Sequence, residues 1–180
     1  MTQAAGVIDI QLRDLAQLFN SFDPSPFHER DLDPRAEEFI VSWAREMPER
    51  SPIRIVLHLP EAAAKAAKQP ELARAITHYF AESATIAERE LREELRQGMR
   101  YGWVALPVLS ICLALSQVAR NVLPPEAPVG LVEESLIILG WVACWKAIET
   151  LLYEWQPIKR RRDLYRRLAT AEVVLGDPTR

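Results

Sequence analysis

Two apolar segments in the C-terminal half constrain this chain more than any other feature. The first, residues 101–119 (YGWVALPVLSICLALSQVA), has no charged residue between Arg100 and Arg120. As a helix it would extend about 28 Å, close to the ~30 Å thickness of the hydrocarbon core of a bilayer. A chain of 180 residues has little core in which to bury such a helix. The segment therefore predicts a transmembrane helix.

The second segment, residues 131–153 (LVEESLIILGWVACWKAIETLLY), is interrupted by Lys146 and Glu149. Its longest uncharged stretch after Glu134 ends at Trp145 and is too short to cross a bilayer. Two alternatives remain open. Either the helix crosses the membrane and buries both ionisable groups, or it ends early and its last part lies along the membrane surface.

Flanking charges favour a complete hairpin with both chain ends in the cytoplasm. Four arginines precede the first segment: Arg89, Arg92, Arg96 and Arg100. Six basic residues, here called the C-terminal basic cluster, follow the second: Lys159, Arg160, Arg161, Arg162, Arg166 and Arg167. Only Arg120 lies between the segments, so the positive-inside rule directs the turn outward. Tyr101, Trp103 and Trp155 would then form an aromatic belt at the cytoplasmic boundary.

Whole-chain averages conceal this pattern. The mean hydropathy of −0.08, the net charge of −3 and the 26% of charged residues resemble those of a soluble domain, because the polar N-terminal half dilutes the hairpin. The first residues show neither a basic region nor an apolar core of a signal peptide. We therefore expect the first membrane helix to target the protein.

The N-terminal half predicts a small strand-helix-strand unit. Alternating apolar residues predict strands at Val7–Leu12 and Ile53–Leu59. Asp33 and Pro34 suit the cap and the first position of an intervening helix. Its apolar face would comprise Ala36, Phe39, Ile40, Trp43, Ala44 and Met47. A crossover of this kind makes the two strands parallel. A short helical turn at residues 15–19 and a loop held by Phe22 and Phe27 would precede the helix.

Two strands make only a marginal sheet, and the sequence shows no third strand of similar quality. Either the chain's own helices cover the open edges, or a second copy pairs with one of them. The second alternative predicts a homodimer with a four-stranded sheet.

After Pro60 the sequence EAAAKAAK turns helical, and a long helical stalk follows a break at Pro70. One apolar stripe runs along this stalk: Leu72, Ile76, Phe80, Ala84, Ala87, Leu91, Leu95 and Gly98. Its eleven-residue rhythm suits a nearly straight packed helix. No proline lies between Glu71 and Pro107, so the stalk is expected to continue into the membrane.

Lys146 and Glu149 form a candidate intramembrane polar pair. Their spacing of three places them on one helix face. Each would cost about 2.5 to 3.5 kcal/mol near the middle of a bilayer, so such residues signal a partner or a function. Hairpin alignment would bring Lys146 level with Pro107, whose ring frees the carbonyl of Trp103 as a further acceptor. The structural interpretation is an ion pair, and the functional alternative is a proton or ion relay.

Other chemistry-bearing residues form no recognisable site. Cys112 and Cys144 fall inside the apolar segments and suit small helix positions. His28, His58 and His78 lack metal-ligand spacing. Four acids near the first helix are explained by capping and by the helix dipole: Asp31, Asp33, Glu37 and Glu38. We therefore expect no catalytic residue, cofactor, metal, nucleic acid or small-molecule substrate, and we assign the C-terminal basic cluster to anionic lipid.

Residues 133–168 resemble the C-terminal part of an uncharacterised bacterial two-helix membrane protein family with the pattern G-W-V-A-x-W-[RK]-x-[IL]-E-x-x-L-Y-[DE]-W-x-P-I-[RK]-R-R. The matching positions include Trp145, Lys146, Glu149, Tyr153, Trp155 and Pro157. Lys146 stands where arginine is expected, and Gln156 stands where an aromatic residue is expected. The resemblance extends loosely to residues 75–95 and to the first strand. It implies a bacterial inner membrane and assigns no activity.

The sequence thus predicts an α+β membrane protein in four parts. Residues 1–60 form a cytoplasmic βαβ unit and 61–100 a helical stalk. Residues 101–155 form the transmembrane hairpin, with helices at 101–119 and about 131–153, and 156–180 form a basic cytoplasmic tail with a helix. The predicted function is a non-enzymatic accessory or scaffold protein that binds the bilayer and oligomerises or joins a membrane protein partner. The alternative is a small subunit of a transporter, channel or membrane enzyme that uses Lys146 and Glu149.

Overall fold

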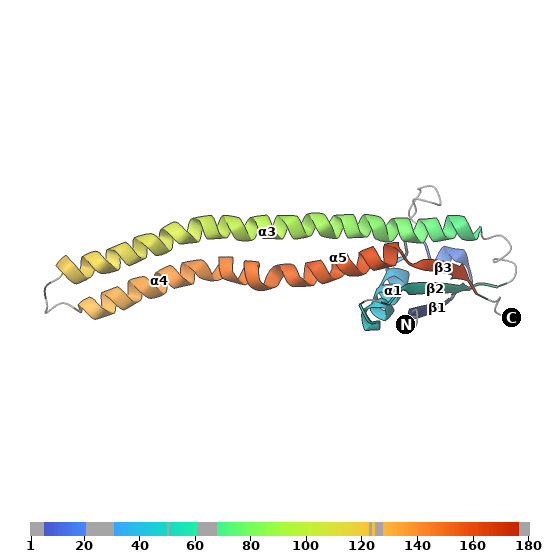
Figure 1. Cartoon of the computed structure of the whole chain (residues 1–180), viewed down its shortest axis with the longest axis horizontal. Helices are drawn as coiled ribbons and strands as arrows, with labels where there is room; N and C mark the ends of the chain where they lie inside the picture. The colour runs from blue at the N-terminus through green and yellow to red at the C-terminus, as the bar shows by residue number, and fades with distance from the viewer. Residues whose placement is uncertain are drawn as a thin grey trace. The chain divides into compact units, whose positions relative to one another are not determined.

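The computed structural model describes residues 6–20, 31–49, 51–60, 68–122, 124 and 128–176. Its elements, in order, are β1 (Gly6–Gln11), a 3-10 turn (Leu15–Gln17), α1 (Pro34–Glu46), β2 (Ile53–His58), α3 (Gln69–Val122), α4 (Val129–Glu149), the π-helix η2 (Thr150–Glu154), α5 (Trp155–Ala169) and β3 (Glu172–Leu175) (Figure 1). They form two compact units. The sheet unit comprises residues 1–87 and 160–180, and the hairpin unit comprises residues 88–159.

The sheet unit is built on the parallel pair β1 and β2, as predicted. Ile8 lies opposite Ile55, and Ile10 lies opposite Leu57. All four side chains are buried. Alternation therefore directs one face of the sheet into the core.

A third strand, β3, completes the sheet, and the expectation that the chain offers only two strands is wrong. β3 pairs parallel with β2, with Val173 opposite Ile55, which makes β2 the central strand of the order β1-β2-β3. The sequence EVVL is too short to show a clear alternation, and its partner lies more than a hundred residues earlier. Local patterning could not reveal this long-range pairing.

The two faces of the sheet differ in chemistry. One face packs on side chains from three helices, including Ile40 of α1, Phe80 of α3 and Leu168 of α5. The other face carries an Arg54–Glu172 ion pair of 2.8 Å and a contact of 3.0 Å between His58 Nε2 and Asp9 Oδ1. The sheet is therefore covered on one side and polar on the other, as is common for two-layer folds.

Helix α1 starts as predicted but buries a different face. Asp33 accepts a hydrogen bond of 2.9 Å from the backbone nitrogen of Arg35, and Pro34 is the first helical residue. The buried residues are Ile40, Val41 and Ala44. The expected core residues Phe39 and Trp43 are instead 41% and 48% exposed. The core-facing arc is centred between Ile40 and Val41, so the aromatic residues lie on its outer side.

Helix α3 continues without interruption from the sheet unit into the hairpin unit. It begins at Gln69, with Pro70 in its first turn, and contains Pro107 in its interior. Most of the predicted stripe is buried, including Ile76 and Phe80, which are 0% exposed. The predicted loop with Phe22 and Phe27, the residue His28 and the EAAAKAAK segment lie outside the described residues.

Three helices of the sheet unit meet at one carboxylate. The hydroxyl groups of Tyr79 on α3 and Tyr165 on α5 donate hydrogen bonds of 2.8 and 2.9 Å to Glu37 on α1. Burial and the hydrogen bond to Glu37 raise the pKa of Tyr165 to about 12, and the same causes raise the pKa of Tyr79. Glu37, which the sequence assigned to the helix dipole, thus holds the helices together.

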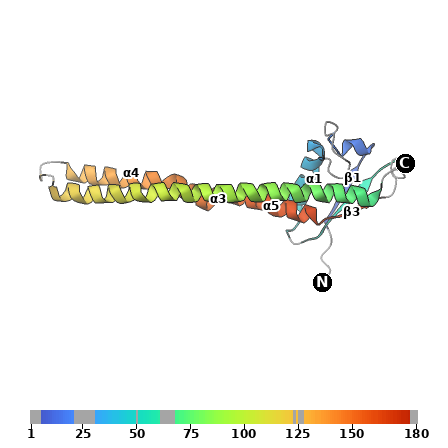
Figure 2. The ribbon, with the colours of Figure 1, turned by 90° about the horizontal axis from the view of Figure 1, so that it is seen from above.

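In the hairpin unit, α3 and α4 run antiparallel and side by side (Figures 1 and 2). Small residues line their contact: Ala105, Cys112, Ser116, Gly140, Cys144 and Ala147 are all buried. Cys144 Sγ lies 3.8 Å from the carbonyl oxygen of Ala105. The outer surface is apolar, with Val104 and Ile138 more than 60% exposed. Among the described residues, two helices are long and apolar enough to cross a membrane.

The contact at Gly140 predicts a stability effect. A Cβ atom added there would lie 2.8 Å from Leu109 Cδ1 and 3.3 Å from Leu109 Cα. We expect Gly140→Ala to lower the stability of the hairpin by about 1 to 3 kcal/mol through overpacking. Thermal unfolding of the full chain in mild detergent would measure this. Gly130→Ala on the same helix meets no atom within 4 Å and should be neutral or stabilising; equal losses in both variants would contradict the prediction.

The Glu37 hydrogen bonds predict a loss of stability at alkaline pH. Because the folded state holds the Tyr165 proton more tightly, its contribution is complete below about pH 10 and is lost as the pH rises through about 12. Denaturation of the full chain at several pH values would measure the decline. Tyr165→Phe should make the decline of stability with pH shallower and should lower the stability of the folded chain at neutral pH. A decline that is unchanged in a variant lacking both tyrosine hydroxyls would refute the assignment.

Candidate functional site

A polar cluster of four residues lies where α4 passes into η2: Lys146, Glu149, Thr150 and Glu154. Lys146 Nζ lies 2.5 Å from Glu154 Oε1 and 3.4 Å from Glu149 Oε2. The Thr150 hydroxyl donates a hydrogen bond of 2.6 Å to the other oxygen of Glu154. The pair predicted from spacing is present, but Glu154 is the closer partner of the lysine.

The π-helix explains how Glu154 reaches Lys146. The two lie eight positions apart in the chain, and a regular α-helix would place them about 80° apart around its axis. A turn closed by i to i+5 hydrogen bonds contains one additional residue. Glu154 therefore takes the angular position of an i+7 residue, two turns along the same face. No sequence signal marks this π-turn, so the sequence did not predict that Glu154 and Thr150 belong to the cluster.

Helix α3 borders the cluster closely. A Cβ atom at Gly98 would lie 3.1 Å from Thr150 Cγ2, so the absence of a side chain lets the two helices approach.

The alignment of α4 with α3 places Lys146 about one helical turn away from the position along α3 that the sequence predicts. Cys144 contacts the carbonyl group of Ala105, and Gly140 contacts Leu109. Because the helices are antiparallel, these two contacts place Lys146 level with Trp103. The prediction that Lys146 lies level with Pro107 is therefore wrong. Among the described residues the hydrogen bonds of Lys146 go to Glu149 and Glu154, and the Trp103 carbonyl is not an acceptor for it.

The C-terminal basic cluster serves more than one purpose. Arg167 donates hydrogen bonds of 2.9 and 3.2 Å to the carbonyl groups of Pro48 and Ser51, which connect α1 to β2. Arg162 is paired with Asp163 at 2.6 Å. Lys159 Nζ lies 5.4 Å from the ring centroid of Trp155, a distance typical of a cation–π contact. Arg160, Arg161 and Arg166 complete the cluster, and the first and last of these three are exposed. Part of the cluster therefore stabilises the sheet unit.

The geometry of the polar cluster predicts unequal effects of two conservative substitutions. Glu154→Gln removes the charge closest to Lys146, whereas Glu149→Gln removes a charge 3.4 Å away. If the cluster stabilises the fold, we expect Glu154→Gln to lower the protein level in the membrane fraction more than Glu149→Gln. Quantitative immunoblotting of both variants beside wild type would measure this. The opposite order would contradict the structural role of Glu154.

Comparisons with protein-family models, with curated proteins and with solved structures found no match to this chain. The family resemblance of residues 133–168 therefore stays a prediction. Function has to be inferred from the polar cluster, the hairpin and the surface of the sheet unit.

Proposed function

We propose that this chain is a membrane-anchored accessory or scaffold protein without enzymatic activity of its own. Its hairpin crosses a bacterial inner membrane, and its sheet unit oligomerises or binds a protein partner at the cytoplasmic surface. The observation that carries this proposal is an exposed aromatic pair on α1. Phe39 and Trp43 are 41% and 48% exposed, and their ring centroids lie 6.0 Å apart.

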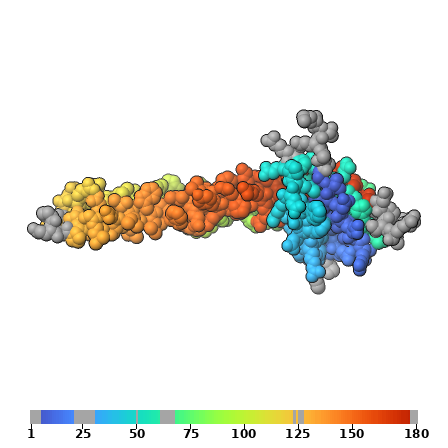
Figure 3. Space-filling view, turned by 90° about the horizontal axis from the view of Figure 1, so that it is seen from below, coloured from blue at the N-terminus to red at the C-terminus, as the bar shows by residue number. Residues whose placement is uncertain are grey.

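The aromatic pair has the character of a protein contact surface. Trp and Phe are enriched at the centres of interfaces, where they supply much of the binding energy. The sheet unit does not need these rings for its own core, because Ile40, Val41 and Ala44 fill the inner face of α1. Figure 3 shows α1, in cyan, on the surface beside β1, in blue. A partner that covers the two rings would remove apolar area from water.

The positions of the three strands along the chain support the proposed membrane topology. Its strands β1 and β2 precede the hairpin, and β3 follows it, yet all three belong to one sheet. Both flanks of the hairpin must therefore lie on the same side of a membrane, so the chain crosses an even number of times. If the first helix crosses, the second crosses back. The exposed rings of Trp103 and Trp145 lie at similar levels and suit the cytoplasmic boundary.

A second function, as a small subunit of a transporter, channel or membrane enzyme, is favoured by one observation. The polar cluster surrounds a π-helical turn, and such turns are frequent at functional sites. In this function Lys146 and the carboxyl groups of Glu149 and Glu154 would pass a proton or bind an ion. Two helices cannot enclose a pore, so this function requires several copies or a larger partner.

The aromatic pair gives the test of the first proposal. We expect the full chain in mild detergent to form a stable homo-oligomer or a stoichiometric complex, measured by light scattering with correction for detergent. Phe39→Ser combined with Trp43→Ser should dissociate it. The control Arg35→Ser combined with Glu46→Ser changes two exposed residues of the same helix and should leave it intact. A monomeric wild-type protein without a stoichiometric partner would overturn the proposal.

A further inference from the structure

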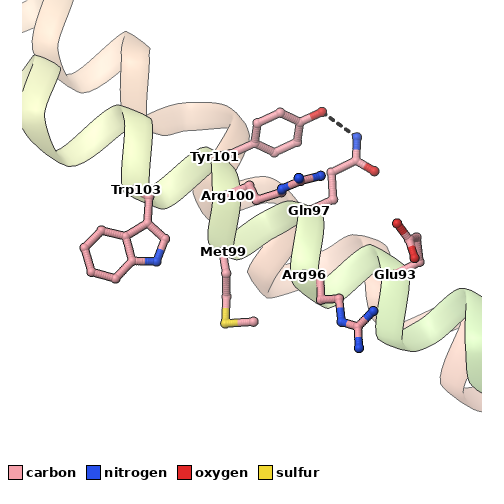
Figure 4. A pocket seen from close by; sticks show the side chains of 7 residues that line it. All are labelled: Glu93, Arg96, Gln97, Met99, Arg100, Tyr101 and Trp103. Carbon is pink, nitrogen blue, oxygen red and sulfur yellow. Dashed lines mark hydrogen bonds between the residues drawn. The ribbon is translucent and has the colours of Figure 1, made fainter.

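We propose that α3 carries a binding site for the phosphate group of an anionic phospholipid, formed by Arg96 and Arg100 beside Met99 and Trp103. The site is a surface hollow of about 730 Å³ in the hairpin unit (Figure 4). Seven residues line it: Glu93, Arg96, Gln97, Met99, Arg100, Tyr101 and Trp103. The proposal rests on the membrane insertion proposed above and extends it to a specific lipid contact.

Helical spacing places the backbone positions of both arginines close together, while Figure 4 shows the Arg100 side chain beside Gln97 and the Arg96 side chain on the other side of the ribbon. Arg96 and Arg100 are four residues apart, so their Cβ atoms are about 5 to 6 Å apart on neighbouring turns. Guanidinium groups match the geometry of phosphate oxygens and can donate two hydrogen bonds each. Rotation of these long, flexible side chains would let one phosphate group receive donors from both arginines. The site binds an anion through charge and hydrogen bonds together.

Both guanidinium groups are available for a ligand. In the described part of the chain neither Arg96 nor Arg100 forms an ion pair, whereas Arg92 is paired with Glu88 at 3.2 Å. Glu93 lines the far end of the hollow and is the one acid among its seven lining residues. Two positive charges and one negative charge leave the hollow cationic. A singly charged phosphodiester complements this balance.

Apolar side chains at the other end distinguish a lipid from a soluble phosphate compound. Figure 4 shows Arg96, Met99 and Trp103 on the same side of the α3 ribbon. Met99 and Trp103 are 54% and 78% exposed, and Trp103 has the highest exposed fraction of the large apolar residues that the structure describes. The uncharged segment of the helix begins directly after Arg100. The order of cationic and then apolar groups matches the order of phosphate, glycerol and acyl chain in a phospholipid.

The rim of the hollow is fixed by a local contact. Gln97 Nε2 donates a hydrogen bond of 2.7 Å to the Tyr101 hydroxyl group. Gln97 and Tyr101 are both lining residues, and their bond holds them against each other one turn apart. Trp103 adds an indole N–H, and indole rings prefer the depth of the headgroups and glycerol. The arginines would thus determine which lipid headgroup binds, and the tryptophan would determine the depth of the site in the membrane.

Retention of lipid by the full chain tests the proposal. The purified protein is exposed to phosphatidylglycerol or to phosphatidylcholine with the same acyl chains, and bound lipid is counted by native mass spectrometry. We expect wild type to retain phosphatidylglycerol preferentially. Arg96→Gln combined with Arg100→Gln should reduce this retention on the order of tenfold or more. The matched control Arg89→Gln combined with Arg92→Gln removes the same charge two turns away and should change it less than about twofold.

Three results would overturn the lipid site. Equal losses of phosphatidylglycerol retention in both double variants would indicate unspecific electrostatic attraction. Unchanged retention in both would show that Arg96 and Arg100 do not bind the lipid. Displacement of the lipid by soluble glycerol 3-phosphate would show that the hollow takes a free phosphate compound. Carbonate extraction of the same variants separates failure of the lipid site from failure of the proposed function. Protein that carbonate releases from the membrane would contradict the membrane anchor. Protein that stays in the membrane but shows no lipid preference would contradict only the lipid site.

Discussion

The continuous helix α3 is the element on which both units depend. Its first turns supply Ile76 and Phe80 to the core of the sheet unit, and its later turns supply Ala105 and Cys112 to the contact with α4. One helix therefore has to satisfy two kinds of packing. Bulky residues fill a core against a sheet in the first part, and small residues admit a neighbouring helix in the second.

The polar cluster shows how a chain neutralises a lysine within an apolar helix. Lys146 finds both of its carboxylate partners on its own helical segment, at Glu149 and Glu154, and the widened turn makes the second contact possible. A change of helical type thus substitutes for a partner from another chain. Gly98 on α3 provides the space in which Thr150 can lie buried beside this turn.

Features set by local chemistry could be predicted from the sequence. Alternation located β1 and β2, and the capping preference of Asp33 located the start of α1. The apolar stripe of α3 was recognisable because its period extends over many turns. The apolar length of the first hairpin helix followed from the absence of charge between Arg100 and Arg120.

Features set by long-range or irregular geometry could not be predicted. β3 depends on pairing with β2, and its four residues carry too little pattern. The Lys146–Glu154 contact depends on a π-turn that has no composition signal. Phe39 and Trp43 satisfied the helical period but lie outside the arc that faces the core, because period alone does not fix the centre of a buried face. Glu37 likewise gained its role only when Tyr79 and Tyr165 came together from separate helices.

The position of β3 in the chain has a consequence for biogenesis. A ribosome completes β1, α1 and β2 before the hairpin and releases β3 only after it, so the central strand β2 keeps one unpaired edge while the hairpin is being made. Unpaired edges favour aggregation. Closure of the sheet by β3 therefore has to follow synthesis of the whole hairpin, so the sheet unit is completed only when the hairpin is complete.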